Sequence, residues 1–323
     1  MVDAVLDTTT AGANSGRQRL ADLLFRGTTR LFAFGVLMLL GAVMLSLLIG
    51  GAPAFQAFGF AFLWGDVWNP VKQIFGGAPA IYGTLITSLI AMLIGVPLAL
   101  GVAMFLTELC PPLLRRPIGI LIELLAAIPS IIYGIWGLFV LAPFLQLTVQ
   151  PFLKETLGNI PLIDFLFRGP PLGIGVLTAG FILAVMVLPF IAAVTRDVFL
   201  TVPAILRESA YGIGCTTAEV VRDIVLPYTR IGVVGGVMLG LGRALGETMA
   251  VTFVIGNAHR ISASLLAPGT TISATLANEF SEAVGPLYIP SLVLLGFILF
   301  IITFCVLAIA KLLLLRLDRQ AAK

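Results

Sequence analysis

The chain has 323 residues, of which 59% are apolar and only 11% are charged, and its formal net charge is +3. A soluble domain averages about 25% charged residues, because polar side chains must cover its surface. The composition therefore excludes a soluble globular enzyme, a disordered chain and a nucleic-acid binder. It predicts an all-α, polytopic membrane helix bundle.

The counts of cysteine, histidine and lysine exclude further kinds of site. The three cysteines, Cys110, Cys215 and Cys305, are scattered and odd in number, so no disulfide framework is expected. The single histidine, His259, excludes a HExxH zinc site and any multi-histidine metal cluster. None of the four lysines lies in a P-loop, GxxxxGK[ST]. We therefore expect no catalytic residues, no metal and no cofactor in this chain.

Six apolar stretches are long enough to cross a bilayer, because a transmembrane helix needs about 20 mostly apolar residues. They cover residues 31–50, 81–106, 118–145, 172–195, 231–256 and 288–312. The first stretch exceeds the 7–15 residues of a signal-peptide core, which favours a retained helix over a cleaved one.

The distribution of basic residues predicts the orientation. With the N-terminus in the cytoplasm, fourteen of the nineteen lysines and arginines fall on the inside, and Arg243 falls within a span. The outside loops hold only Lys72, Lys154, Arg168 and Arg260. Six spans place both termini in the cytoplasm. The predicted organisation is a cytoplasmic tail over 1–30, a six-helix transmembrane domain over 31–312 and a cytoplasmic tail over 313–323.

Several ionisable groups near the ends of the spans are expected at the surface. Glu108 is interpreted as a solvated loop acid, Glu123 as a group that reaches the cytoplasmic interface, and His259 as a polar loop residue. Asp197 is expected to pair with Arg196 or with a neighbouring helix.

The cytoplasmic segment 196–230 is too long and too patterned for a simple connector. Pro203 can open a helix, and Gly214 suits a left-handed position that ends one. Thr216 followed by Glu219 is typical of a capping box for a second short helix, which is expected to stop before Pro227. By geometry alone this helix–turn–helix is either an amphipathic pair on the membrane surface or a docking element for a partner.

The residues of this segment resemble the EAA signature of ABC-importer permeases, E-A-A-x3-G-x9-I-x-L-P. Only the second position departs, with serine in place of alanine. The resemblance implies that the segment docks on a separate ATP-binding subunit and transmits that subunit's closure to the membrane helices. The matching residues are Glu208, Ser209, Ala210, Gly214, Ile224, Leu226 and Pro227.

From about residue 76 onward the chain resembles the PstC-type phosphate permeases of binding-protein-dependent ABC importers. The resemblance lies in Gly83-Thr84, Ile128-Pro129-Ser130, Tyr133-Gly134, Leu188-Pro189, residues 240–251 and Gly256-Asn257. It implies a type I importer permease fold in the bacterial plasma (inner) membrane. The implied partners are a second homologous permease subunit (PstA-like), ATP-binding subunits (PstB-like) and a periplasmic or lipid-anchored phosphate-binding protein (PstS-like).

Two alternatives remain open at this point. One is a permease for another oxyanion, such as sulfate or molybdate, because the EAA segment contacts the ATPase and not the solute. The other is a secondary transporter, although the sequence shows no paired, interrupted halves of the kind such carriers often have.

The predicted fifth span carries two charges. Arg243 lies about 18 Å beyond its start, near the middle of the hydrocarbon core, where a charge usually faces a cavity or the bundle interior. Glu247, four residues on, is expected to pair with Arg243 on the same helix face. This face is either a packing seam or the wall of an anion path. In the second case Arg243 would bind phosphate, and Glu247 would orient the Arg243 side chain. Small residues that favour close helix packing share the face: Gly232, Gly236 and Gly240.

Overall fold

The computed structural model describes residues 3–156, 158, 160 and 164–321. The chain divides into two units, Met1–Gly50 and Gly51–Lys323, and each is described by itself. The described part of the first unit is helical and belongs to α1 (Asp3–Phe58), whose last residues belong to the second unit. The predicted boundary between tail and first span, at residues 30 and 31, falls within this helix.

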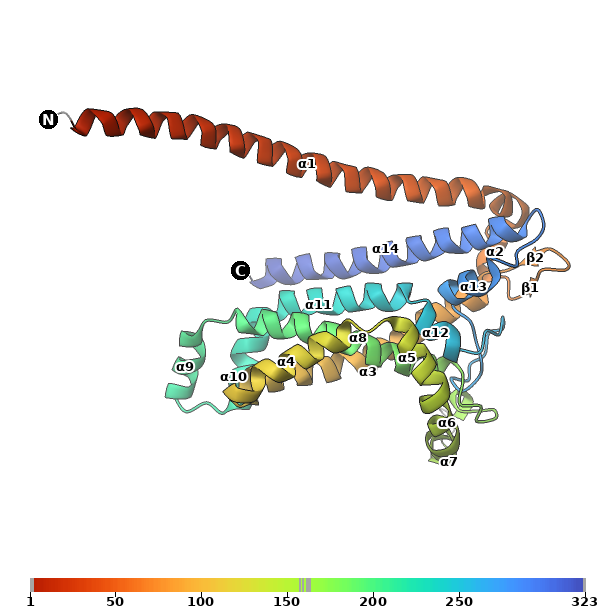
Figure 1. Ribbon diagram of the computed structural model, residues 1–323. Coiled ribbons are helices and arrows are strands. Elements are labelled where there is room, and N and C mark those ends of the chain that lie inside the picture. Colours follow the sequence, from red (N-terminus) through yellow and green to blue (C-terminus); the bar gives the residue numbers. More distant parts are fainter. Residues whose placement is uncertain (1–2, 157, 159, 161–163, 322–323) are drawn as a thin grey trace. The chain divides into compact units, whose positions relative to one another are not determined.

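The second unit is a bundle of helices with one short hairpin (Figure 1). The hairpin pairs β1 (Trp68–Asn69) with β2 (Ile74–Phe75) in antiparallel fashion. The helices are α2 (Ala61–Trp64), α3 (Ala78–Met104), η1 (Phe105–Leu109), α4 (Pro112–Ala126), α5 (Ser130–Trp136), η2 (Gly137–Leu141), α6 (Ala142–Phe144), η3 (Leu145–Val149), α7 (Gln150–Thr156), η4 (Asp164–Leu166), α8 (Val176–Leu200), α9 (Ala204–Gly212), α10 (Thr217–Val220), η5 (Val221–Val225), α11 (Leu226–Gly246), α12 (Met249–Val254), α13 (Ile272–Glu279) and α14 (Tyr288–Ala321).

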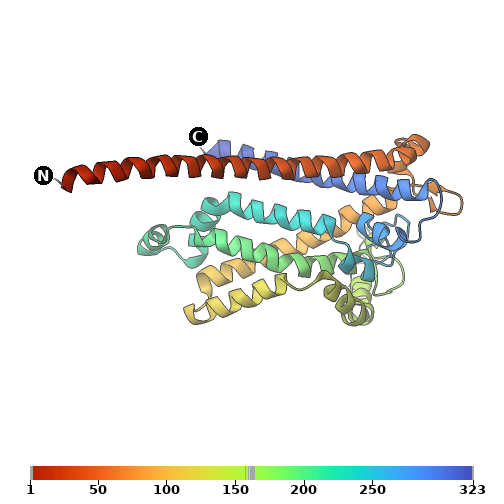
Figure 2. The same ribbon diagram turned by 45° about the horizontal axis from the view of Figure 1, so that its top comes forward.

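Among the described residues, six helical segments are long and apolar enough to cross a membrane, which confirms the predicted number of spans. They are Leu20–Phe58, Ala78–Leu109, Ser130–Thr156, Val176–Leu200, Thr217–Gly246 and Tyr288–Leu312. Within the second unit, α9 lies at one end of the bundle, and α13 and the hairpin lie at the other (Figures 1 and 2).

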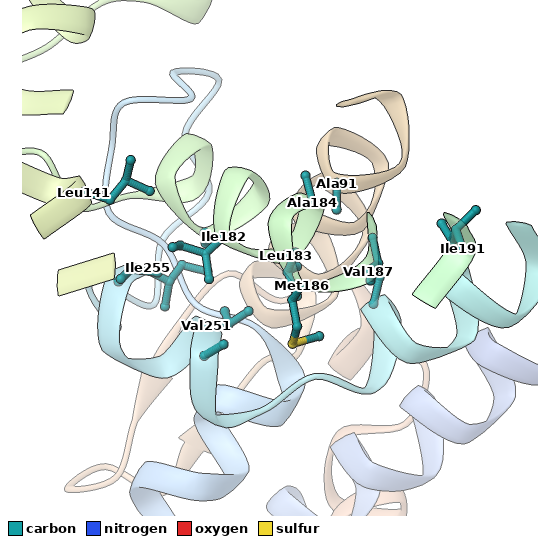
Figure 3. Close-up of a cluster of buried hydrophobic side chains, with 14 of the residues drawn as sticks. Ala91, Leu141, Ile182, Leu183, Ala184, Met186, Val187, Ile191, Val251 and Ile255 are labelled. Carbon is teal, nitrogen blue, oxygen red and sulfur yellow. The ribbon is translucent and has the colours of Figure 1, made fainter. Parts of the chain in front are cut away.

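Helix α8 lies at the centre of the bundle and packs lengthwise along α3. Met186 and Val187 of α8 are buried near Ala91 of α3 and Val251 of α12 (Figure 3). Lipid tails are as apolar as these side chains, so close packing and not hydrophobic burial holds membrane helices together. Small residues permit that packing: a Cβ on Gly180 would lie 2.6 Å from the Ile90 side chain.

The predicted third span, 118–145, is wrong as one continuous helix. Helix α4 ends at Ala126, and a new helix, α5, begins at Ser130. Pro129 explains the break, because a proline disfavours the helical conformation in the residue before it and lacks the N–H of a helix interior. The candidate span is therefore Ser130–Thr156, and α4 is a separate amphipathic helix that contacts α8.

At the hairpin end, His259 is not the surface residue that the sequence suggested. Its ring stacks on Trp68 at 5.3 Å between centroids, and its Nε2 lies 2.6 Å from Oε1 of Glu279. The other oxygen of Glu279 accepts hydrogen bonds from Trp68 Nε1, at 2.7 Å, and from the Tyr288 hydroxyl, at 2.8 Å. The Glu279 carboxylate therefore ties the hairpin and the 257–271 loop to α13 and the start of α14.

Candidate functional site

The segment between α8 and α11 has the predicted helix–turn–helix form. Helix α9 begins directly after Pro203, and Gly214 has a φ of +93°, a conformation that favours glycine. The capping box is present: the Thr216 N–H donates to Oε2 of Glu219 at 2.7 Å, and the Glu219 N–H donates to the Thr216 hydroxyl at 3.4 Å.

The expected stop before Pro227 is wrong. Helix α10 continues through the wider π-helical turn η5 directly into α11, and Pro227 lies in the first turn of α11. In a regular α-helix the proline ring would clash with the carbonyl four residues earlier, and the wider turn relieves that clash. Helix α10 and η5 are therefore continuous with the membrane-spanning helix α11.

The residues of the EAA-like signature divide between two faces. Ala210 is buried in a small cluster with Phe199 and Val220, and Ile224 and Leu226 pack against that cluster. Glu208, Ser209 and Gly214 are exposed. Large apolar side chains accompany them on the exposed side: Ile205, Tyr211 and Ile213, the last with 84% of its surface exposed. The segment is thus anchored to the bundle by one face and leaves the other uncovered.

An ion pair that the sequence did not suggest anchors α9. Nη2 of Arg207 lies 3.1 Å from Oε1 of Glu108 and donates to the carbonyl oxygen of Phe199 at 2.7 Å. Only 5% of the Glu108 side chain is exposed, so the expectation of a solvated loop acid is wrong. No motif links residues so far apart in the sequence, and only the apposition of η1 with α9 brings them together.

The predicted pairing of Arg243 with Glu247 on one helix is wrong. Helix α11 ends at Gly246, and Glu247 has an extended backbone with ψ of 132°. Oε1 of Glu247 instead accepts a hydrogen bond from the Ala250 N–H, at 3.2 Å, in the first turn of α12. The first N–H groups of a helix have no acceptor within that helix, so the Glu247 carboxylate satisfies one of them at the start of α12. The run Gly246-Glu247-Thr248 is the sequence signal for this break.

Arg243 lies in the last turn of α11 and is exposed. Its guanidinium lies 5.9 Å from the centroid of the Phe190 ring, and it is close enough to the Tyr133 phenol for the two to interact electrostatically. It forms no hydrogen bond or ion pair with another residue that the structure describes. A cation is favoured by the dipole at a helix C-terminus, and the donors of this guanidinium remain unused.

The three glycines of α11 lie against α8. A Cβ would lie 2.5 Å from the Val198 side chain at Gly232, 3.1 Å from Val194 at Gly236, and 2.5 Å from Ile191 at Gly240. These glycines therefore form the contact of α11 with α8, and Arg243 lies near Phe190 of α8 with its side chain still exposed.

The chain is similar to known components of membrane transport systems. Residues 95–319 match the family described as the binding-protein-dependent transport system inner membrane component. The phosphate transport system permease protein PstC of Mesorhizobium japonicum is 66% identical over 304 residues, which cover 94% of this chain and 93% of the relative. The protein of the same name from Pasteurella multocida is 56% identical over 315 residues, which cover 98% of each chain.

Two solved structures share the fold. A chain of the MetNI methionine ABC transporter in an inward-facing conformation aligns with a TM-score of 0.51 and 18% identity, and covers 75% of this chain and 94% of that one. A chain of a bacterial ABC transporter involved in alginate import aligns with a TM-score of 0.51 and 18% identity, and covers 74% of this chain and 78% of that one.

Proposed function

The chain belongs to the binding-protein-dependent transport system inner membrane component family, and from this membership we propose that it is the permease subunit of an ATP-driven importer of inorganic phosphate. The observation that carries the choice of substrate is the 66% identity with a phosphate permease over nearly the whole chain. Six apolar helices place the chain in the bacterial inner membrane as a multi-pass protein. In this proposal both termini and α9 lie in the cytoplasm, as the distribution of basic residues indicates.

We assign the wall of the translocation path to the end of α11. A charged side chain within a membrane protein faces a cavity or a partner and not lipid. The unused donors of Arg243 form a planar, permanently charged fork that matches the oxygens of phosphate. A second, homologous permease subunit would cover this face and complete the path.

The break after Gly246 gives Glu247 a different role from the one its spacing suggested. Its carboxylate holds the start of α12 and thereby fixes the shape of the backbone next to Arg243. A pocket at this break is lined partly by hydroxyl groups, from Thr248, Ser273 and Ser281. Hydroxyl groups can donate hydrogen bonds to a passing anion, and they bind it less tightly than a second cation would.

Segment α9–α10 is proposed to dock on an ATP-binding subunit through its uncovered face. The exposed apolar side chains of Ile205 and Ile213 suit a groove on a partner, and Glu208 and Gly214 lie beside them. When two such ATP-binding subunits close on ATP, α9 and α10 would move with them. The continuous helix from Thr217 to Gly246 would then carry that movement to Arg243. Hydrolysis and release would reset the path.

The test of the path is Arg243→Gln in the complete complex, reconstituted in vesicles together with the phosphate-binding protein. We expect ATP-dependent uptake of radioactive phosphate to fall to background while the subunits still assemble. Lys72→Gln, an exposed loop residue, is the matched control and should transport normally. Normal uptake by Arg243→Gln would remove this residue from the path.

The test of the substrate uses the unmodified complex. Phosphate should compete with radioactive phosphate for uptake, whereas sulfate and molybdate at equal concentration should not. Competition by either of those anions would favour the other oxyanion permeases. Uptake that follows a proton or sodium gradient and does not need ATP would favour a secondary transporter.

A further inference from the structure

A pocket of about 300 Å³ lies between η1, α4 and the C-terminal end of α8. This is the α9 end of the bundle, since α9 follows α8 after a short turn. The pocket combines three arginines with apolar side chains on its walls: Arg115, Arg116, Arg196, Leu106, Ile120 and Leu200.

Arg196 forms a fixed wall of this pocket. Its Nη2 lies 2.7 Å from Glu123 of α4 and 2.8 Å from Asp197 beside it in α8. A Cβ on Gly119 would lie 2.5 Å from Nη1 of Arg196, so the glycine makes room for the guanidinium to reach across α4. Arg196 is thus fully engaged by two carboxylates, of which that of Glu123 also lines the pocket, and it joins α4 to α8.

The other two arginines are not balanced. Nη2 of Arg115 donates to the carbonyl oxygen of Thr107 at 2.9 Å, and its Nε is buried without a hydrogen-bond partner among the described residues. Arg116 is exposed and has no hydrogen bond or ion pair with a residue that the structure describes. The pocket therefore offers two positive charges, one of them with an unmet buried donor, to a ligand with acceptor oxygens.

We propose that this pocket binds the phosphate group of an anionic phospholipid. Lipid headgroups lie at the ends of membrane-spanning helices, and basic pockets between such helices on the cytoplasmic side suit them. Free phosphate would offer the same oxygens, but the apolar walls at Leu106, Ile120 and Leu200 favour a ligand that also carries a glycerol backbone and acyl chains. A lipid held there would contact η1, α4 and α8 together, and η1 is the segment that holds Glu108.

The experiment uses the complete transporter complex, purified in a mild detergent from cells that contain phosphatidylglycerol and cardiolipin. Native mass spectrometry counts the anionic lipids retained per complex. We expect Arg115→Gln with Arg116→Gln to reduce retention at least fivefold, and Arg115→Lys with Arg116→Lys to keep most of it. Lys72→Gln with Arg260→Gln removes the same charge from two exposed residues at the hairpin end of the second unit, opposite the α9 end, and should leave retention unchanged.

A second arm separates a lipid from free phosphate. In nanodiscs of neutral phosphatidylcholine, equilibrium binding of radioactive inorganic phosphate is compared between the unmodified complex and Arg243→Gln, with and without the two pocket substitutions. Phosphate binding that the pocket substitutions abolish, with lipid retention unchanged, would overturn the lipid in favour of free phosphate. If the pocket substitutions change neither lipid retention nor phosphate binding, the pocket binds neither ligand and the proposal is overturned. If the double variant does not assemble, Arg116→Gln alone, at an exposed side chain, provides the same measurement with an expected twofold or larger loss of lipid.

Discussion

The guanidinium of Arg207 in α9 lies 3.1 Å from the carboxylate of Glu108 in η1, and the side chain of Glu108 is almost fully buried. The same guanidinium donates to carbonyl oxygens of Phe199 and Val202 at the end of α8 and in the turn after it. One side chain therefore joins α9 to two membrane-spanning helices. Under the proposed docking of α9 on an ATP-binding subunit, this residue would link movement of α9 to α3 and α8, in addition to the route through α10 into α11.

The first prediction concerns this pair. Arg207→Met should destabilise the complex, because removing one partner of a buried ion pair costs about 3–5 kcal/mol. It should also uncouple phosphate uptake from ATP hydrolysis, because α9 loses its link to the membrane-spanning helices. Adding Glu108→Met should recover part of the lost stability, since no unpaired charge remains. Thermal unfolding of the purified complex measures the change in stability. Phosphate uptake and ATP hydrolysis, measured together in vesicles, report the uncoupling. Arg222→Gln is the control: its pair with Asp223 is exposed, so loss of that pair should cost at most about 1 kcal/mol.

The second prediction concerns the turn between α9 and α10. Gly214→Val should abolish the stimulation of ATP hydrolysis by phosphate-loaded binding protein, because a β-branched residue is strained at a φ of +93°. The left-handed region costs other residues roughly 1–2 kcal/mol. A Cβ at Gly214 would meet nothing within 4 Å, so any effect comes from the backbone and not from a clash. Gly212→Ala, in α9 with equally open surroundings, should be harmless. Normal stimulation of ATP hydrolysis in Gly214→Val would contradict a role of this turn in coupling.

Sequence reasoning was most accurate where the signal is local. The number of spans follows from apolar runs of the right length, and the Thr216–Glu219 capping box and the left-handed Gly214 follow from preferences within a few residues. It was wrong where two local preferences compete. A long apolar run hid the breaks before Ser130 and after Gly246, although Pro129 and the run Gly246-Glu247-Thr248 mark them.

Contacts between distant segments could not be predicted from one sequence. The pairing of Glu108 with Arg207, and of His259 with Glu279, depends on which helix ends meet in space. Burial decides whether such a group is solvated or paired, and hydropathy gives no register between helices that are far apart in the chain. The error at Glu247 is of the local kind, because its carboxylate accepts a hydrogen bond from the Ala250 N–H, three residues on, at the start of α12.

The third prediction concerns the contact of α11 with α8. Gly240→Ala should destabilise the bundle by about 1–3 kcal/mol, because the new methyl group would lie 2.5 Å from the fully buried Ile191. Ile191→Ala in the same chain should relieve the overlap and restore assembly. Gly235→Ala lies on the same helix with nothing within 4 Å and serves as the control. Thermal unfolding of the complex distinguishes these variants, and equal stability of Gly240→Ala and Gly235→Ala would refute close packing at this site.

The last prediction concerns the Glu279 carboxylate and pH. Burial disfavours its charged form, but hydrogen bonds from His259, Tyr288 and Trp68 outweigh burial, so the pKa of Glu279 lies below its ordinary range. A carboxyl whose pKa falls on folding contributes stability above its unfolded-state pKa, and this contribution is lost as the pH falls through the folded-state pKa. Glu279→Gln should therefore lower the melting temperature of the complex at neutral pH.

The difference between the unmodified complex and Glu279→Gln should narrow once the pH falls below about 4.3, the usual pKa of a glutamate. Other carboxyls titrate in the same range, and comparison of the two proteins at each pH removes their contribution. Glu282→Gln is the matched control, because Glu282 is a nearby exposed glutamate for which the structure gives no hydrogen bond from these three side chains. A difference that stays constant as the pH falls well below about 4.3 would show that Glu279 acts through its shape and not through its charge.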